Sequence, residues 1–116
     1  MSARTVLIVD DHEVFRSSAR AVLEAAGYEV VGEAADAAGA IAEARRITPD
    51  AILLDIQLPD RDGFAVCAEL GLDGPAIVLI SSRQAVDYGS RLRDGNSRGF
   101  IHKPDLCRAT LAALLG

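Results

Sequence analysis

The sequence predicts an α/β fold in which five helices cover both faces of a five-stranded parallel sheet. Short runs of aliphatic and β-branched residues recur five times, and stretches with the spacing of amphipathic helices follow them. The middle runs VLIV, AILL and IVLI are apolar at every position, as strands covered on both faces must be. Strands that alternate with helices favour right-handed crossovers, and therefore parallel strands.

The five expected strands are short and are flanked by glycine, proline or aspartate. They comprise residues 5–9, 28–32, 51–54, 76–80 and 99–102. We find no internal repeat, low-complexity tract or linker between them, so the whole chain is expected to form one domain, residues 1–116.

Apolar residues fall on one face of the first, second and last expected helices. These faces consist of Phe15, Ala19, Val22, Leu23 and Ala26; of Ala37, Ile41 and Ala44; and of Cys107, Leu111, Leu114 and Leu115. A short third helix is expected at residues 64–70, and a fourth at residues 84–93 that ends at the turn DGNSRG.

Three residues are expected to mark helix ends. Gly27 follows the first helix, where a left-handed backbone conformation is wanted. Asp36 and Asp105 precede helical stretches and can accept hydrogen bonds from the first free N–H groups, so we expect both to be N-caps.

Composition narrows the function classes. Half of the 116 residues are apolar and a quarter are charged, as in ordinary globular domains. The net charge of −5 argues against binding of nucleic acid or an anionic membrane by this chain alone. No apolar run approaches the roughly 18 residues of a membrane span, and no signal peptide is seen, so we expect a cytoplasmic protein.

Cys67 and Cys107 lack metal-type spacing and are expected to be reduced thiols packed along helices.

Polar residues end four of the five expected strands. They are Asp10 and Asp11 after the first, Asp55 after the third, Ser81 and Ser82 after the fourth, and Lys103 after the fifth. Because the carboxyl ends of parallel strands lie on one edge of the sheet, these side chains should converge in one polar pocket.

Close carboxylates repel one another, so such a cluster takes up protons or binds a cation. Its oxygen ligands suit a hard ion such as Mg2+, which readily shares a phosphate. The pocket therefore predicts a phosphoryl-transfer site, in which Mg2+ and Lys103 neutralise phosphoryl oxygens while an aspartate carboxylate attacks in line. An aspartyl phosphate would result, and the Ser81 hydroxyl can donate a hydrogen bond to it.

Each of these residues has a simpler interpretation by itself. Asp10 and Asp11 could cap a helix, Asp55 could belong to a turn, Ser81 could be an N-cap, and Lys103 could be a solvated surface lysine. The conjunction favours the site, because chemically complementary groups stand at four strand ends that a parallel sheet brings together.

The motifs VLIVDDHEVFR, AILLDIQLPDRDG, IVLISS and RGFIHKP resemble those of the receiver domain of two-component response regulators. The resemblance covers essentially the entire chain. It implies a doubly wound, flavodoxin-like (β/α)5 fold with strand order 2-1-3-4-5. The chain looks most like receivers that precede a helix-turn-helix DNA-binding domain, because it combines the motifs VDDH, YEVVGEA and RGFIHK.

The resemblance also implies a role for individual residues. It makes Asp55 the phosphoacceptor, Asp11 a direct Mg2+ ligand, and Asp10 an acidic partner that reaches the metal mainly through water. Asp55 would also bind the metal, as would the backbone carbonyl of Gln57.

On the other side of the pocket, the resemblance implies that Ser81, with Ser82 beside it, senses the phosphoryl group. Lys103 would contact the phosphate, and Phe100 would be the aromatic switch residue. A cis peptide bond before Pro104 is implied as well.

Three further residues lie next to these positions in the sequence. Arg83 either shields the phosphoryl group or faces solvent. Strand alternation points His102 away from the side of Lys103, which favours a structural or surface role. His12 is expected in the first helical turn rather than on the metal, since imidazole is a poor ligand for Mg2+.

These observations predict a phosphorylation switch that catalyses only its own phosphorylation and dephosphorylation. The expected partners are a sensor histidine kinase and, on phosphorylation, a second copy of the chain. DNA would be contacted only through an output domain absent from this chain.

The alternative is a pseudo-receiver, an interaction module that works without phosphorylation. Such a module is expected to lack an acidic residue or the lysine of the pocket, and neither is lost here. A phosphatase with an aspartate nucleophile would need a second aspartate at Gln57.

Overall fold

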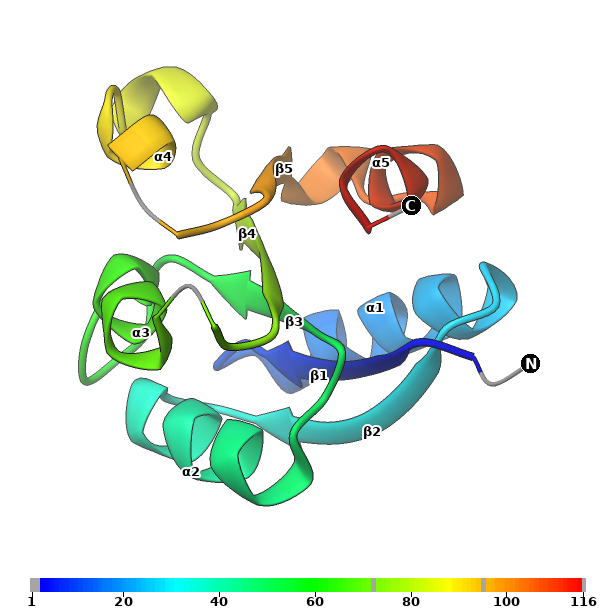
Figure 1. The fold of residues 1–116 in the computed structure, drawn as a ribbon. Coiled ribbons are helices and arrows are strands. Elements are labelled where there is room, and N and C mark those ends of the chain that lie inside the picture. The colour runs from blue at the N-terminus through cyan, green and yellow to red at the C-terminus, as the bar shows by residue number, and fades with distance from the viewer. Residues whose placement is uncertain (1–2, 72, 95, 116) are drawn as a thin grey trace.

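The computed structural model describes residues 3–71, 73–94 and 96–115, which fold around one parallel sheet (Figure 1). Its strands are β1 (Thr5–Val9), β2 (Glu29–Ala34), β3 (Ala51–Asp55), β4 (Ala76–Ser81) and β5 (Gly99–His102). All neighbouring pairs are parallel, and the strand order is β2-β1-β3-β4-β5. The predicted fold class and strand order are confirmed.

Helices flank both faces of this sheet. They are α1 (Glu13–Ala25), α2 (Ala37–Ile47), α3 (Gly63–Leu70), α4 (Arg91–Asp94) and α5 (Arg108–Leu115), with single 3-10 turns η1 (Ala85–Asp87) and η2 (Lys103–Asp105). Helices α1 and α5 pack on one face, and α2 and α3 pack on the other (Figure 1). Among the residues described, no helix combines the length and apolar character needed to cross a membrane.

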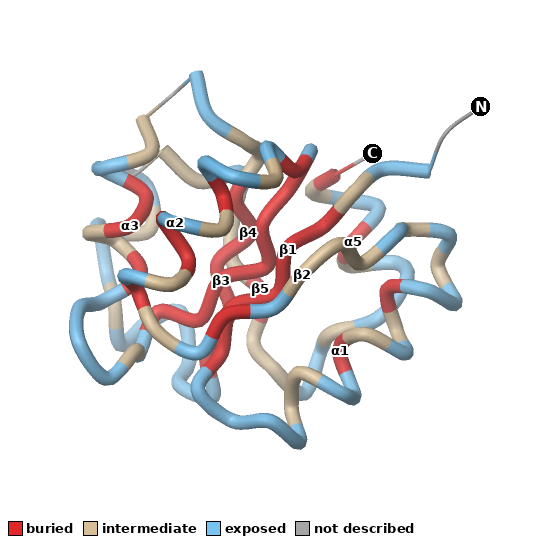
Figure 2. The backbone as a smooth tube through the Cα atoms, turned by 90° about the horizontal axis from the view of Figure 1, so that it is seen from below, coloured by how far each residue is buried: buried red, intermediate tan, exposed pale blue. Residues whose placement is uncertain are grey.

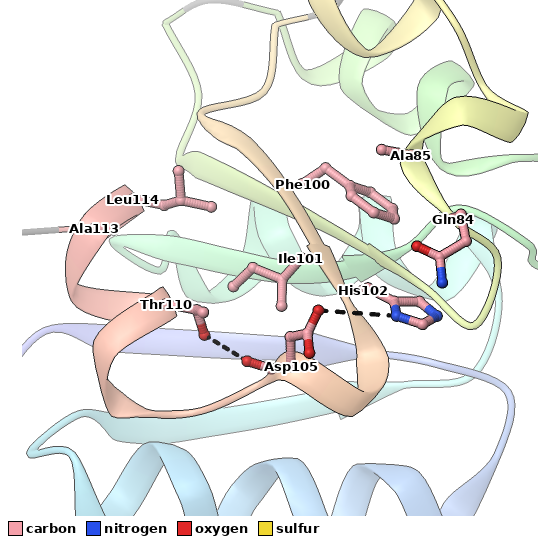
Figure 3. Close-up of a pocket in the computed structure, with 9 residues that line it drawn as sticks. All are labelled: Gln84, Ala85, Phe100, Ile101, His102, Asp105, Thr110, Ala113 and Leu114. Atoms are coloured by element: carbon pink, nitrogen blue, oxygen red, sulfur yellow. Dashed lines mark hydrogen bonds and ion pairs between the residues drawn. The ribbon is translucent and has the colours of Figure 1, made fainter.

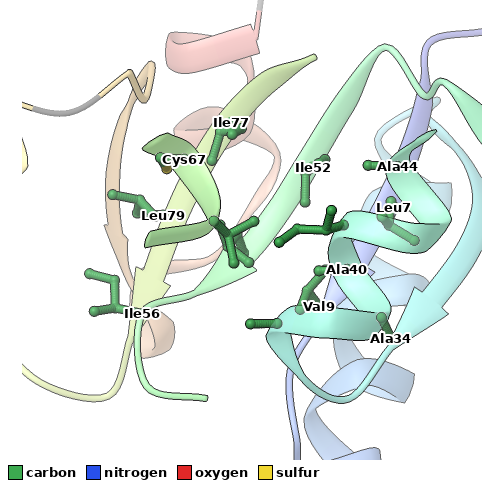
Figure 4. Packing of buried hydrophobic residues seen from close by; sticks show 14 residues of the cluster. Leu7, Val9, Ala34, Ala40, Ala44, Ile52, Ile56, Cys67, Ile77 and Leu79 are labelled. Carbon is green, nitrogen blue, oxygen red and sulfur yellow. The ribbon is translucent and has the colours of Figure 1, made fainter. Parts of the chain in front are cut away.

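The three central strands are buried along almost their whole length (Figure 2). Alternate residues point to opposite faces of a strand, so each strand contributes to two cores. In β1, Leu7 and Val9 pack with α2 and α3 (Figure 4), whereas Val6 and Ile8 pack with α1 and α5. This two-sided burial explains why the central strands are apolar at every position.

The expected signals at the ends of α1 and α2 are confirmed. Gly27 follows α1 and its C-cap with a φ of 94°, a left-handed conformation that favours glycine. Asp36 is the N-cap of α2, and its side chain accepts a hydrogen bond of 2.7 Å from the Gly39 N–H.

The expected fourth helix at residues 84–93 is wrong. The chain instead forms η1 and then the four-residue α4. Gly89, with a φ of 58°, lies between them and interrupts the helical path. Val86 is 83% exposed, so this segment buries too little apolar surface to stabilise a longer helix.

Three expectations near the C-terminus also need correction. Asp105 ends η2 and does not cap α5, which begins three residues later. Leu106, the C-cap of η2, and Cys107 lie between them in the chain. Cys107 is exposed before α5, although Cys67 is buried on α3 and both thiols are free. The peptide bond before Pro104 is trans, as are all others described. Because the intrinsic preference at proline is about 0.5–1 kcal/mol, surrounding contacts decide the isomer.

At the start of α3, the backbone of Gly63 lies so close to the backbone of Asp55 and Ile56 that there is no room for a side chain. A Cβ atom there would lie 2.7 Å from the Asp55 carbonyl oxygen and 2.9 Å from the Ile56 Cα. We expect Gly63→Ala to lower the free energy of unfolding by about 1–3 kcal/mol, measured by urea denaturation. Gly32→Ala is the control, since the nearest atoms there are movable side-chain ends of Ile47 and Leu7. An equal or larger loss in the control would contradict this account.

Candidate functional site

The expected pocket forms at the carboxyl edge of the sheet. Among the described residues, the buried polar or charged side chains are Asp10, Asp55 and Ser81. Asp10 follows β1, while Asp55 and Ser81 are the last residues of β3 and β4. The parallel register brings these ends together, with Asp55 opposite Ile80.

Lys103 joins two of the buried carboxylates. Its Nζ lies 2.6 Å from Asp10 Oδ2 and 3.2 Å from Asp55 Oδ2. The same ammonium lies 4.4 Å from the centre of the Phe15 ring, a position suited to a cation–π contact. Only 14% of the lysine side chain is exposed, so this charge pair is largely shielded from water.

Backbone N–H groups hold the remaining carboxylate oxygens. The His12 N–H donates to Asp10 Oδ1 at 2.8 Å, and the Gln57 N–H donates to Asp55 Oδ1 at 3.0 Å. Both bonds join a carboxylate to the residue two positions later in the loop that leaves the strand. The loops after β1 and β3 therefore fix the orientation of the two aspartates.

The two aspartates have opposite pKa shifts. Burial raises the pKa of Asp55 to about 6, since the Gln57 N–H and Lys103 offset burial only in part and the charge of Asp10 adds to it. Burial also acts to raise the pKa of Asp10, but hydrogen bonds from Lys103 and the His12 N–H outweigh it and leave this pKa below its usual value. Asp10 thus stays ionised at a pH where Asp55 can hold a proton.

The acidic side of the pocket fits a cation. Ligand atoms of Asp10, Asp11, His12 and Asp55 all lie within 4.8 Å of one another. Three carboxylates form a donor set suited to a hard ion such as Mg2+, and Asp11 is open to solvent. His12 is the N-cap of α1, one residue before the helical turn expected for it, and its Nδ1 lies 3.0 Å from Asp11 Oδ1.

Sequence reasoning missed Tyr88, which lies in the connection between β4 and β5. Its hydroxyl shares a hydrogen bond of 2.6 Å with the Ser81 hydroxyl. The Tyr88 ring also contacts Phe100, with 6.0 Å between the ring centres. The sequence gives only a weak signal for this role, because residues 84–93 were expected to form a helix, and a tyrosine on such a helix is usually an ordinary surface residue.

Other expected residues lie at the rim. Ser82 and Arg83 are exposed, and the Arg83 N–H donates to the Ser81 hydroxyl oxygen at 3.0 Å. His102 contacts the backbone carbonyl of Ser82 through Nε2 at 2.9 Å, in agreement with a structural role. The roles of Ser82, Phe100 and the Gln57 carbonyl in switching or metal binding stay predictions.

Two acidic residues beyond Asp55 serve the helices. Asp60 accepts hydrogen bonds from the N–H groups of Ala37 and Ala38 at 2.8 and 3.0 Å, at the start of α2. Asp62 is the N-cap of α3 and accepts from the Ala65 N–H at 2.9 Å. The acidic turn after β3 therefore anchors the helices that flank the pocket.

Fold and pocket define a class of protein, the doubly wound α/β domains that carry aspartates and a lysine at the carboxyl edge of the sheet. Within this class, the chain belongs to the response regulator receiver domain family, whose family model matches residues 6–114.

Individual relatives agree with this assignment. The transcriptional regulatory protein PdtaR of Mycobacterium tuberculosis is 34% identical over 103 residues, which cover 87% of this chain and 50% of PdtaR. The signal receiver domain of NarL from the same species has a TM-score of 0.84 at 30% identity and covers 100% of this chain and 99% of that one. The chemotaxis response regulator CheY4 of Vibrio cholerae has a TM-score of 0.83 at 26% identity, and the match covers 98% of this chain and 97% of CheY4. The chain spans about half the length of the curated relatives that it matches.

Asp55→Asn should raise the free energy of unfolding at pH 7 in the absence of Mg2+, by about 1–3 kcal/mol. With the pKa of Asp55 raised to about 6, the protonated carboxyl stabilises the folded state fully below about pH 4. That contribution is lost as the pH rises through 6, because the folded protein must then hold a buried charge. The advantage of the variant should therefore vanish near pH 4, as measured by urea denaturation with a chelator.

Asp60→Asn provides a control of opposite sign. Hydrogen bonds from the Ala37 and Ala38 N–H groups lower the pKa of Asp60, so its charge stabilises the folded state above the unfolded pKa. This variant should be less stable than the wild type at pH 7. Equal stability of Asp55→Asn and wild type at pH 7 would contradict the buried-charge account.

Proposed function

We propose that this receiver domain accepts a phosphoryl group on Asp55 from a sensor histidine kinase in a Mg2+-dependent reaction. The single observation that supports this most directly is the position of Lys103, whose ammonium lies within 3.2 Å of both the Asp10 and Asp55 carboxylates. A cation held beside a buried carboxylate is suited to neutralise the oxygens of a phosphoryl group placed there.

Mg2+, when bound, would neutralise negative charge on the phosphoryl oxygens and orient them. Asp10, Asp11, Asp55 and the Gln57 carbonyl are the residues that would hold it. The Asp55 carboxylate would attack the phosphorus in line as the bond to the donor breaks, and an aspartyl phosphate would form. Lys103 would then turn from the carboxylate pair to the new phosphoryl oxygens, and the Ser81 hydroxyl would donate a hydrogen bond to them.

The surface of α4, β5 and α5 would carry the signal. Phe100 is half-buried on β5 and lines an open hollow of about 370 Å3 (Figure 3). Gln84 and Ala85 border the hollow from the β4–β5 connection, and Ala113 and Leu114 border it from α5. A movement of Ser81 toward the phosphoryl group would change the space beside Phe100 and thereby reshape this surface.

The output would be a change in assembly or in an attached domain. The chain would act as one receiver domain in the cytoplasm, dimerise on phosphorylation or control an output domain, and catalyse only its own phosphorylation and dephosphorylation. The relative PdtaR is described as a transcriptional regulatory protein, which supports transcription as the process under control. The net charge of −5 supports DNA contact only through an output domain.

Intact-protein mass spectrometry after incubation with Mg2+ and a small acyl phosphate tests the phosphoacceptor. The wild type should gain one phosphoryl group, and Asp55→Asn should gain none. Prior chelation of Mg2+ should abolish the adduct, because the uncompensated carboxylates repel the donor. A folded wild type that gains no adduct would favour the phosphorylation-independent interaction module.

Amide chemical shifts test the proposed surface. Addition of beryllofluoride, a mimic of the phosphoryl group, with Mg2+ should shift resonances of β5, α5 and the β4–β5 connection as well as those of the pocket. Resonances of residues on α2 that face solvent, such as Ala42, serve as an internal control and should stay in place. Shifts confined to the pocket would count against transmission to this surface.

A further inference from the structure

The Ser81 hydroxyl is held from the side of the β4–β5 connection. Its oxygen accepts the Arg83 N–H at 3.0 Å and shares a hydrogen bond of 2.6 Å with the Tyr88 hydroxyl. Within the described part of the chain, no hydrogen bond joins it to the Asp55 carboxylate, whose partners are the Gln57 N–H and Lys103. The hydroxyl is therefore directed by Tyr88 and the local turn, although its side chain is fully buried at the end of β4.

The position of the Tyr88 hydroxyl is itself well defined, because the ring is packed between two other aromatic residues. The Phe64 ring centre lies 5.9 Å away at an interplanar angle of 63°, and the Phe100 ring centre lies 6.0 Å away at 56°. Edge-on and tilted contacts of this kind are favourable and restrict rotation. Tyr88 thus contacts both Ser81 and the aromatic residue of β5.

A serine hydroxyl has one proton and two lone pairs. The Arg83 N–H occupies one lone pair, and Tyr88 occupies either the second lone pair or the proton. If Ser81 donates to Tyr88, its only proton is already used. If Tyr88 donates, the oxygen is still held at 2.6 Å from the phenol. In either case a phosphoryl group on Asp55 must compete with Tyr88 for the serine hydroxyl.

We propose that Tyr88 is a positioning residue that holds the Ser81 hydroxyl in the unphosphorylated arrangement and opposes its transfer to the phosphoryl group. The inference rests on the proposed phosphoacceptor function of Asp55. An interaction present only in the unphosphorylated state lowers the affinity for the phosphoryl group by the factor with which it stabilises that state. For one hydrogen bond between uncharged groups, this factor is about fivefold.

Tyr88→Phe tests the inference because it keeps the aromatic packing and removes only the hydroxyl. We expect this variant to bind beryllofluoride in the presence of Mg2+ about fivefold more tightly than the wild type, measured by calorimetric titration. The chain offers a matched control, since its other tyrosine, Tyr28, is half-buried against the core on the opposite face of the sheet. Tyr28→Phe should leave the affinity unchanged.

The same pair of measurements in the Ser81→Ala protein separates positioning from a general effect on stability. Without the serine hydroxyl, Tyr88→Phe should no longer change the affinity for beryllofluoride. A structural role alone would lower the melting temperature in both backgrounds and would give no gain in affinity that depends on Ser81.

Each outcome decides a different point. If the wild type binds beryllofluoride and Tyr88→Phe binds it equally or more weakly, the positioning role is wrong and the phosphoacceptor site stands. If Tyr88→Phe raises the affinity for beryllofluoride equally in the Ser81→Ala protein, the positioning role is also wrong, because the Tyr88 hydroxyl would then act through a group other than Ser81. If the wild type does not bind beryllofluoride with Mg2+, the phosphoacceptor function falls and this inference falls with it.

Discussion

The ion pair between the Lys103 ammonium and the Asp10 and Asp55 carboxylates is the interaction on which the site depends. Buried charges are costly unless they are paired, and here the carboxylate that follows β1 and the carboxylate at the end of the adjacent strand β3 share one cation. Lys103 follows the edge strand β5 and reaches back past the end of β4. The strand order therefore determines which groups meet, and the meeting of unlike charges makes their burial tolerable.

The two carboxylates are nevertheless not equivalent. Asp10 lies closer to the lysine, at 2.6 Å against 3.2 Å, and its pKa is lowered, whereas burial raises the pKa of Asp55 to about 6. One lysine is insufficient to stabilise both charges. When ionised, the three carboxylates of Asp10, Asp11 and Asp55 carry two more charges than Lys103 can balance, which is the electrostatic reason that this pocket suits a divalent cation.

The connection between β4 and β5 has less regular structure and fewer buried residues than the rest of the fold. Its helical segments η1 and α4 are short, and much of its surface is exposed. Tyr88 anchors it to Ser81 and Phe100, and Arg91 anchors it to α3 through Asp62 at 2.8 Å and the Phe64 ring at 4.2 Å. A segment held by few side chains can change its arrangement at little free-energy cost, and this one contacts the pocket through Tyr88 and contains α4 of the proposed output surface.

Sequence by itself determined the sheet, the two-sided core and the convergence of Asp10, Asp55, Ser81 and Lys103, because apolar periodicity and strand ends are local patterns. It also indicated the caps at Gly27 and Asp36. Only the tertiary structure decided the split of the expected fourth helix, the trans bond before Pro104, the unequal pKa values of the two aspartates and the contact of Tyr88 with Ser81. The pKa values depend on contacts between residues far apart in the chain, and the other three features depend on which surfaces and side chains the folded chain packs together. Neither kind of contact is encoded in the local spacing of apolar residues.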